Sequence, residues 1–334
     1  MSEEILHAYR GTIVENIHRG DIVVVDNNGS ILNKVGDTQK LTYLRSAAKP
    51  FLALNVILSG AAEHYGFGDR ELAVMCASHR GETYHTEVLA GIVDKIGLQS
   101  DSLLHCGITE PFSKAAAINL YKSGQPLSPL HCNCSGKHLG MISVCIHKGY
   151  PIENYYDISH PVQQDALEIL SKFTGIDKDK IIIGVDGCTV PVHGIPLYNM
   201  ALAYARLGNP TNLDTSYASA ANRLTNAIVS YPEMISGMKS FCTDLMIAGR
   251  RDIVGKVGAD GVYCIAIPKE GIGIALKIEN GDMRSCHIAA ANVLKQLNLL
   301  NEGQCTYLSK YLNSPVFDNY KNKIGEYKAV FNLK

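Results

Sequence analysis

RSAAKPFLALNVILSGAA, residues 45–62, is apolar nearly all round. A helix without a polar face must be covered on every side, so we predict a buried central helix here. Ser46 and Lys49 lie three residues apart near its start, and on a helix this spacing puts both side chains on one face. Pro50 disfavours the helical conformation at Lys49, although the first turn of a helix tolerates proline.

Strand-like patterns occur on either side of this helical region. GDIVVVDNNGSILNKVG, residues 20–36, has two apolar runs around Asn28-Gly29, which predicts a hairpin. GVYCIAI and GIGIALKI, residues 261–278, predict a second one. We therefore expect one α/β (α+β) domain over residues 1–334. Its antiparallel sheet would come from about 1–40 and 250–334, packed with a helical region of about 45–245.

Composition argues against several classes of partner. The formal net charge is -1 and the basic residues are scattered, so we expect neither nucleic acid nor a membrane surface as a partner. No apolar run approaches the roughly 18 residues of a membrane span. The start MSEEILHAYRG is acidic and unlike a signal peptide. We expect a cytoplasmic protein whose cysteines are mostly reduced and buried.

Ser46 and Lys49 are a candidate nucleophile and base. Apolar neighbours would bury Lys49, and burial disfavours a charged ammonium, so the uncharged amine can accept a proton. A serine hydroxyl is a weak nucleophile until such a base takes its proton. S-x-x-K alone is weak evidence, because a helix cap followed by a solvent-reaching lysine has the same pattern.

Two further elements raise the weight of this pair. Serine β-lactamases and penicillin-binding proteins combine S-x-x-K with a serine on a loop between helices and K-T-G on a late strand. This chain has Ser78-His79-Arg80 after the helical run ELAVMCA, and Lys256-Val257-Gly258 before the last hairpin. The order is the same, but S-H-R replaces S-D-N and valine replaces threonine. We therefore expect a substrate other than a β-lactam.

A second group of candidate residues is rich in cysteine. HCNCSGKHLG, residues 131–140, and GVDGCTVP, residues 184–191, together contain Cys132, Cys134, Lys137, His138, Asp186 and Cys188. Two thiolates with nitrogen ligands suit Zn²⁺. Because no C-x-x-C pair is present, spacing alone favours buried cysteines in glycine turns. A catalytic Cys134 is a further option.

Several segments together resemble the Rhizobium etli type L-asparaginase family, notably RSAAKPFLAL, GFGDRELAVMCASHRGE, NCSGKHLGM, SHPVQQ, GVDGCTVPVHGIPL and GKVGADGVYC. The resemblance runs from about Gly11 to about Gly281. It implies a fold similar to that of serine β-lactamases, and hydrolysis of L-asparagine to L-aspartate and ammonia. We also expect a homodimer.

The resemblance implies roles for individual residues. It pairs Ser46 with Lys49 and Ser78 with Lys256, and it implies a zinc ion held by Cys134, Lys137 and Cys188. The extra Cys132 leaves open which thiol binds the metal. Candidates for contacts with the substrate are Arg45, His79, Arg80, His138 and Asp186.

The predicted reaction is acyl transfer in two steps. Lys49 takes the proton of Ser46, Ser46 attacks the side-chain amide carbon, and Ser78 with Lys256 relays a proton to the leaving ammonia. The zinc would orient the substrate, and the roles of the two serines can be exchanged. A zinc-hydroxide amidase, a glutaminase-like amidase and a penicillin-recognising ligand sensor without turnover stay open. Asparagine and glutamine differ by one methylene, worth only about 1–3 kcal/mol of discrimination.

Overall fold

The computed structural model describes all of residues 1–334, and the chain divides into two compact units. Unit 1 comprises Met1–Ala47, Ile195–Asn209 and Asp244–Lys334, and unit 2 comprises Ala48–Gly194 and Pro210–Thr243. None of the helices combines the length and the apolar character that crossing a membrane requires. The expectation of one domain over the whole chain stays a prediction.

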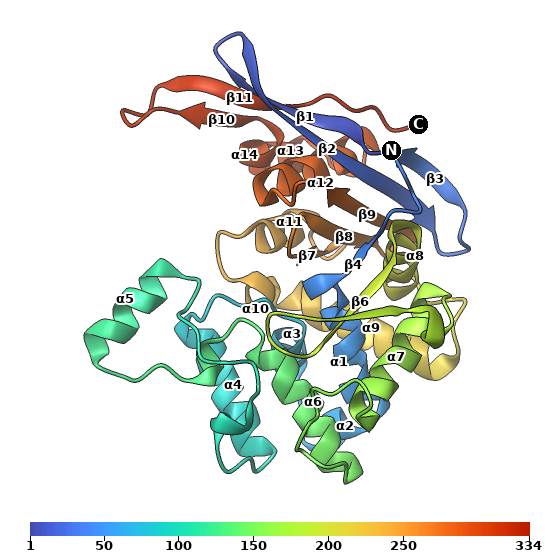
Figure 1. The fold of residues 1–334 in the computed structure, drawn as a ribbon, viewed down its shortest axis with the longest axis vertical. Helices are drawn as coiled ribbons and strands as arrows, with labels where there is room; N and C mark the ends of the chain where they lie inside the picture. The colour runs from blue at the N-terminus through green and yellow to red at the C-terminus, as the bar shows by residue number, and fades with distance from the viewer. The chain divides into compact units, whose positions relative to one another are not determined.

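Unit 1 is built on an eight-stranded antiparallel sheet. Its strands are β1 (Glu3–Arg10), β2 (Ile13–Asp26), β3 (Ile31–Val35), β7 (Val254–Gly258), β8 (Val262–Ile267), β9 (Ile272–Ile278), β10 (Ser314–Phe317) and β11 (Lys323–Ala329). The order is β10-β11-β1-β2-β9-β8-β7, and β3 also pairs with β2. In Figure 1 the blue N-terminal and the brown to red C-terminal strands lie side by side. The predicted sheet from the two ends of the sequence is thereby confirmed, as are both hairpins.

Unit 1 has five helices, which are α8 (Leu197–Gly208), α11 (Phe241–Gly249, which begins in unit 2), α12 (Met283–Gln296), α13 (Glu302–Tyr307) and α14 (Ser309–Leu312). Of these, α8 and α12 pack against this sheet. Helix α8 approaches β9 so closely that a Cβ at Gly273 would lie 1.9 Å from the carbonyl oxygen of Ala201. Only glycine allows that contact, which brings the helix down onto the strand. Short strand β4 (Leu41–Tyr43) and the 3₁₀ turn η1 (Arg45–Ala48) complete the unit.

Unit 2 is mainly helical. Its helices are α1 (Lys49–Leu58), α2 (Ala61–His64), α3 (Asp69–Met75), α4 (Thr83–Lys95), α5 (Lys114–Ser123), α6 (Ser135–Lys148), α7 (Pro161–Thr174), α9 (Thr215–Ser230) and α10 (Pro232–Ser236). Short 3₁₀ helices lie at Asp101–Leu103, Pro129–His131 and Lys178–Lys180. Strand β5 (Ile182–Val185) pairs antiparallel with the first residues of β6 (Pro191–Pro196).

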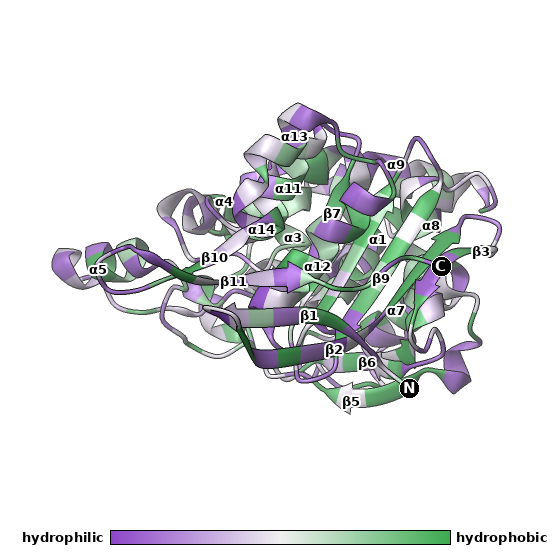
Figure 2. Cartoon of the chain, turned by 90° about the horizontal axis from the view of Figure 1, so that it is seen from above, coloured by the Kyte–Doolittle hydropathy of each residue, from purple (hydrophilic) through white to green (hydrophobic).

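The predicted buried helix is α1, which packs against α6, α7 and α9 and buries the residues from Lys49 to Val56. Its α-helical part begins at Lys49, with Pro50 in the first turn, where a missing N–H costs nothing. Figure 2 shows the hydrophobic colour gathered on α1 and, in unit 1, on β9 and α8, whereas α5 is mixed in character. The core of each unit therefore follows the apolar runs of the sequence.

Helices α3 and α6 of unit 2 approach each other through a glycine. A Cβ on Gly136 would lie 2.1 Å from the carbonyl oxygen of Val74, a contact that no real side chain makes. Val74 lies near the end of α3, four residues before Ser78, and Gly136 lies at the start of α6, next to Lys137. This close packing holds the beginning of α6 beside the loop that carries Ser78.

Candidate active site

Lys49 has a buried side chain with three oxygen partners, all within unit 2. Only 1% of the residue is exposed. Its Nζ lies 2.6 Å from Ala77 O, 3.1 Å from Ser78 Oγ and 3.5 Å from Asn133 O. The amine donates to all three oxygen atoms, and these hydrogen bonds hold it beside the Ser78 hydroxyl.

The other predicted serine, Ser46, lies half-buried in η1, the 3₁₀ turn that precedes α1. Within unit 2, the predicted serine that forms a hydrogen bond with Lys49 is Ser78. The pairing of Ser46 with Lys49 rested on α-helical spacing, whereas residues 45–48 adopt the tighter 3₁₀ form. That pairing stays a prediction.

Two further candidates belong to unit 1. Lys256 lies on β7 with 2% of its surface exposed, and its Nζ donates to Val257 O at 3.1 Å. Arg45 has a positive φ of 50° and forms an ion pair with Asp260. A carboxylate of the protein thus already binds the guanidinium of Arg45. The predicted pair of Ser78 and Lys256 joins residues of different units and stays a prediction.

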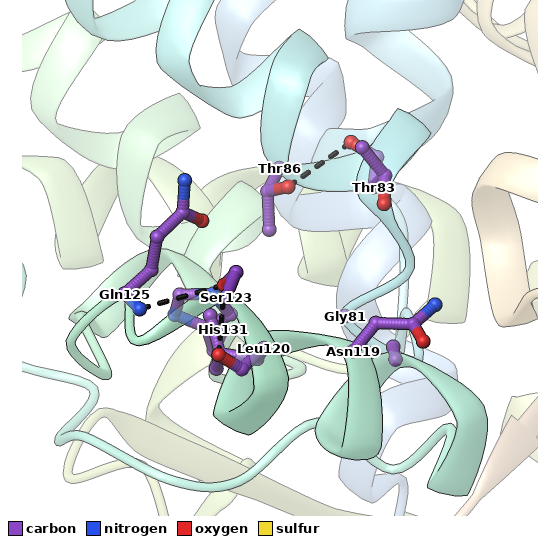
Figure 3. Close-up of a pocket in the computed structure, with 9 residues that line it drawn as sticks. Gly81, Thr83, Thr86, Asn119, Leu120, Ser123, Gln125 and His131 are labelled. Carbon is purple, nitrogen blue, oxygen red and sulfur yellow. Dashed lines mark hydrogen bonds between the residues drawn. The ribbon is translucent and has the colours of Figure 1, made fainter.

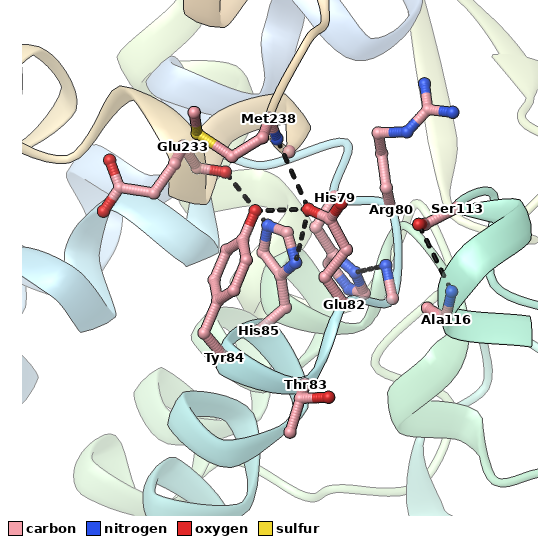
Figure 4. Close-up of polar contacts among 12 residues, drawn as sticks. His79, Arg80, Glu82, Thr83, Tyr84, His85, Ser113, Ala116, Glu233 and Met238 are labelled. Carbon is pink, nitrogen blue, oxygen red and sulfur yellow. Dashed lines mark hydrogen bonds and ion pairs between the residues drawn. The ribbon is translucent and has the colours of Figure 1, made fainter. Parts of the chain in front are cut away.

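The loop that carries Ser78 is held by hydrogen bonds to the segment around α10. The Ser78 N–H donates to Ile235 O at 2.9 Å, and His85 Nε2 donates to Glu233 O at 3.0 Å. Glu82 Oε2 accepts from Met238 N–H at 3.3 Å and from the Tyr84 hydroxyl, as Figure 4 shows. These contacts hold the backbone of the loop in place and thereby orient the Ser78 side chain.

His79 and Arg80, both predicted to contact the substrate, bind other parts of unit 2. The Gly81 N–H donates to His79 Nδ1 at 3.1 Å, so Nε2 carries the ring proton and donates to Ser135 Oγ at 2.9 Å. Burial holds the pKa of His79 well below its usual range, so the ring is neutral. Arg80 donates to Phe112 O at 3.0 Å. Their predicted contacts with the substrate stay predictions.

The two cysteine-rich segments meet around one lysine in unit 2. Cys134 is the N-cap of α6, Lys137 lies in its first turn, and Cys188 lies between β5 and β6. Lys137 Nζ donates to Cys188 Sγ at 2.8 Å and lies 4.0 Å from Asp186 Oδ2. Cys188 Sγ lies 3.6 Å from the same carboxylate oxygen. The structure thus brings together the three residues that the resemblance assigned to zinc, with Asp186 beside them.

Hydrogen bonds among the sulfur atoms polarise this cluster. The thiols of Cys132 and Cys188 bond to Cys134 and lower its pKa, while the bond to Cys134 raises the pKa of Cys188. Burial would lower the pKa of Lys137, but negative charge on Cys134 and Cys188 outweighs it and raises the pKa. In the absence of a metal these shifts favour negative charge on Cys134 and positive charge on Lys137.

The donor set fits a zinc ion. Two sulfur atoms and one amine nitrogen are buried together, and these are ligand atoms that Zn²⁺ accepts. No group of three or more histidine, cysteine, aspartate or glutamate side chains in the chain could hold a metal. A zinc site here would thus depend on the Lys137 amine as its third ligand, and the zinc ion stays a prediction. The Cys132 thiol donates to Cys106 O at 3.4 Å.

The candidate His138 lies among buried polar residues of unit 2 that the sequence analysis did not single out. His138 is fully buried, with Nδ1 2.6 Å from the Tyr155 hydroxyl and no partner for Nε2. His193, on β6, is buried with no partner on either nitrogen, and burial lowers its pKa to about 4. Tyr155 and His193 were both missed, because a lone tyrosine or histidine in an apolar segment is most often a core residue.

Two pockets open on unit 2. One of about 690 Å³ is lined by His105, Cys106, Pro129 and the residues on either side of Cys188, Gly187 and Thr189, among others. A smaller one of about 210 Å³ lies between the start of α4 and the end of α5, with Thr83, Ser123 and His131 in its wall (Figure 3). The larger pocket therefore adjoins the cysteine cluster, whereas neither is lined by Lys49 or Ser78.

Two solved structures are similar to the chain. A structure of Mglu in its native form is similar to the chain, with a TM-score of 0.47 and 16% identity over 84% of this chain and 65% of that chain. The match thus spans just under two thirds of Mglu. A β-lactamase from Mycobacterium bovis is similar with a TM-score of 0.42 and 13% identity, over 87% of this chain and 94% of that one.

Neither structural neighbour bears on the substrate. No curated protein matches the sequence. The sequence profile of the L-asparaginase II family, by contrast, matches residues 6–329, which includes both Ser-Lys elements and both cysteine-rich segments. Nearly the whole chain is covered by that one family of hydrolases. The chain belongs to the L-asparaginase II family.

Proposed function

We propose that this protein is an L-asparaginase of the Rhizobium etli type, which hydrolyses L-asparagine to L-aspartate and ammonia through a Ser-Lys nucleophile. Membership of the L-asparaginase II family supports an amide as substrate. The observation that carries the mechanism is the buried Lys49 amine, which lies within hydrogen-bond reach of the Ser78 hydroxyl and of two backbone carbonyl oxygens. In its uncharged form an amine so placed acts as a general base.

The first step is acylation. Lys49 takes the proton of Ser46, the Ser46 oxygen attacks the side-chain amide carbon, and backbone N–H groups stabilise the oxyanion. Collapse of the tetrahedral intermediate breaks the C–N bond. The proton then passes from Lys49 through the Ser78 hydroxyl, 3.1 Å away, to the leaving nitrogen, which departs as ammonia.

The second step is hydrolysis of the ester on Ser46. Water attacks the acyl carbon, Ser78 with Lys49 and Lys256 accepts its proton, and L-aspartate leaves as Ser46 regains a proton. Cys134, Lys137 and Cys188 would hold a zinc ion that supplies a Lewis-acidic point for orienting the substrate's polar end. Asp186, His138, Arg45, His79 and Arg80 are proposed to contact or frame the substrate.

An ammonia-release assay tests this function. The purified protein is given L-asparagine, L-glutamine, a β-aspartyl dipeptide and a chromogenic β-lactam at equal concentrations. We expect release from L-asparagine to be the fastest, and Lys49→Met to abolish it. Fastest turnover of glutamine would make the protein a glutaminase-like amidase. Binding of these compounds without turnover would contradict the enzymatic function and favour a sensor.

The expected homodimer is a separate proposal. Sedimentation velocity at several protein concentrations gives the mass of the particle in solution. A mass near twice that of the 36.3 kDa chain supports a homodimer, and a mass near that of the chain contradicts it.

A further inference from the structure

Tyr155 is a buried residue with two polar contacts in unit 2. Only 1% of it is exposed, and its ring lies edge-on to that of His138, with ring centres 5.6 Å apart. Its hydroxyl oxygen lies 2.8 Å from the backbone nitrogen of His105 and 2.6 Å from His138 Nδ1. The backbone oxygen of Tyr155 accepts from Gln163 Nε2 at 2.7 Å, which anchors the residue.

These two contacts decide where the hydrogens lie. A backbone N–H can only donate, so the Tyr155 oxygen accepts from His105. The Tyr155 O–H then needs an acceptor, and His138 Nδ1 is the remaining atom within reach. With a bare Nδ1 the His105 N–H and the Tyr155 O–H are both paired, whereas a proton on Nδ1 would leave the Tyr155 O–H and a bare Nε2 both without partners. The contacts therefore favour the neutral ring with its proton on Nε2.

The Nε2–H of His138 has no acceptor in the protein. The ring is fully buried and Nε2 is one of the few buried polar atoms without a hydrogen bond. His138 follows Cys134 by four residues at the start of α6, where its N–H bonds to Cys134 O at 3.2 Å, so both side chains share one face of the helix. An unpaired buried donor on that face is what an oxygen of a bound ligand would satisfy.

We propose that Tyr155 is a positioning residue, which holds His138 in the Nε2–H tautomer so that His138 donates a hydrogen bond to an oxygen of the amide substrate. A nitrogen that carries a proton has no lone pair for a metal, so the same tautomer keeps His138 from becoming a zinc ligand. Tyr155 thereby separates the donor His138 from the ligands Cys134, Lys137 and Cys188. The inference rests on the proposed amidase function for the identity of the ligand.

A matched pair of substitutions tests the donor. The amide nitrogen of glutamine reaches the position of the histidine Nε2, whereas that of asparagine reaches only the position of Nδ1. We expect His138→Gln to retain kcat/KM for asparagine within about tenfold of the wild type, and His138→Asn to lie at least about tenfold lower than His138→Gln. A higher KM in His138→Asn would show that His138 donates its hydrogen bond to the bound substrate. A lower kcat would show that it donates to the oxyanion that develops during the reaction. Equal activity of the two variants would overturn the proposal.

The tautomer itself has a spectroscopic test that needs no activity. Long-range ¹H–¹⁵N spectra of the zinc-loaded protein distinguish the protonated from the bare ring nitrogen, with His138→Gln identifying the resonances. We expect a bare Nδ1 in the wild type and a mixture of tautomers in Tyr155→Phe, which keeps the ring and removes the hydroxyl. A wild-type spectrum with the proton on Nδ1, or an unchanged spectrum in Tyr155→Phe, would contradict the role of Tyr155.

These two experiments separate the inference from the proposed function. A wild type that releases ammonia while His138 carries its proton on Nδ1 contradicts only the inference. A wild type with the Nε2–H tautomer that hydrolyses no amide contradicts the proposed function and leaves the role of Tyr155 in setting the tautomer supported.

Discussion

The Nζ of Lys49 lies 3.1 Å from the Oγ of Ser78, although 28 residues separate them in the chain. The bond joins the first residue of α1 to the loop between α3 and α4, both in unit 2. Two backbone carbonyl groups complete the surroundings of the amine.

Removal of the Lys49 amine should abolish turnover while the fold persists. Lys49→Met keeps the length and the apolar stem of the side chain but cannot accept a proton. We expect kcat for asparagine to fall by about 10²–10⁴-fold, the range of general base catalysis. Initial rates of ammonia release measure this, with thermal unfolding as the control for the fold. Retention of more than about a tenth of the activity would exclude Lys49 as the base.

The two serines should respond differently to a reagent that traps the nucleophile. A diazoketone analogue of asparagine alkylates the attacking hydroxyl, and peptide mass spectrometry locates the label. We expect the label on Ser46, its loss in Ser46→Ala, and its slower formation in Ser78→Ala, because Ser78 only relays the proton in the proposed mechanism. A label on Ser78 would make Ser78 the nucleophile and Ser46 the proton relay. The contact between Lys49 and Ser78 is compatible with that assignment too.

Zinc content should depend on Cys134, Lys137 and Cys188 but not on Cys132. Each ligand supplies one bond to the metal, so Cys134→Ser, Cys188→Ser and Lys137→Met should each weaken zinc binding by at least about tenfold. The matched control is Cys132→Ser, which keeps a hydrogen-bonding side chain next to Cys134. Metal analysis after dialysis against a weak chelator measures retention. Equal loss of zinc in Cys132→Ser and Cys134→Ser would make Cys132 a ligand.

The contact between α6 and α3 should make Gly136 intolerant of a side chain. A Cβ there would meet the Val74 carbonyl oxygen, and neither backbone can give way without moving its helix. We expect Gly136→Ala to lower the free energy of unfolding by roughly 1–3 kcal/mol, as overpacking does. Gly91→Ala in α4 is the control, because nothing lies within 4 Å of its added carbon and alanine favours the helix. Urea unfolding gives the free energy of unfolding of each variant. An equal change in Gly136→Ala and Gly91→Ala would disprove the close packing.

Stability should fall as the pH drops from about 6.5 toward 4, in part because of His85. Burial lowers the pKa of His85 to about 4, against about 6.5 in an unfolded chain. The unfolded chain therefore takes up the proton first as the pH falls, and the stabilisation present above pH 6.5 is lost on the way to 4. The full difference is up to about 3 kcal/mol.

Unfolding by urea at a series of pH values measures this loss. In His85→Gln the decline between pH 6.5 and 4 should be shallower than in the wild type. The exposed His64→Gln is the control, because its ring meets water in both the folded and the unfolded chain. A decline of the same steepness in His85→Gln would show that His85 does not carry it.

Local patterns in the sequence were sufficient for the secondary structure and the sheet. The apolar run at 49–58 forms α1, and the turn at Asn28-Gly29 joins β2 to β3, because side-chain periodicity and turn chemistry act over a few residues. Strands at both ends with helices between them implied one sheet from the two ends, and β2 indeed pairs with β9. The motifs also indicated an asparaginase, and the match to the L-asparaginase II family confirms that part of the prediction.

Contacts between distant segments were decided only by the tertiary structure. The S-x-x-K spacing pointed to Ser46 as the partner of Lys49, and that pairing stays a prediction. The hydrogen bond from Lys49 to Ser78, which joins α1 to the loop after α3, had no such signal in the spacing. Likewise no pattern places the Tyr155 hydroxyl on His138, or Cys188 on Lys137, since such contacts follow from how helices pack and glycines allow close approach. Spacing along a chain reports neighbours on one element, whereas a site is made of side chains from several.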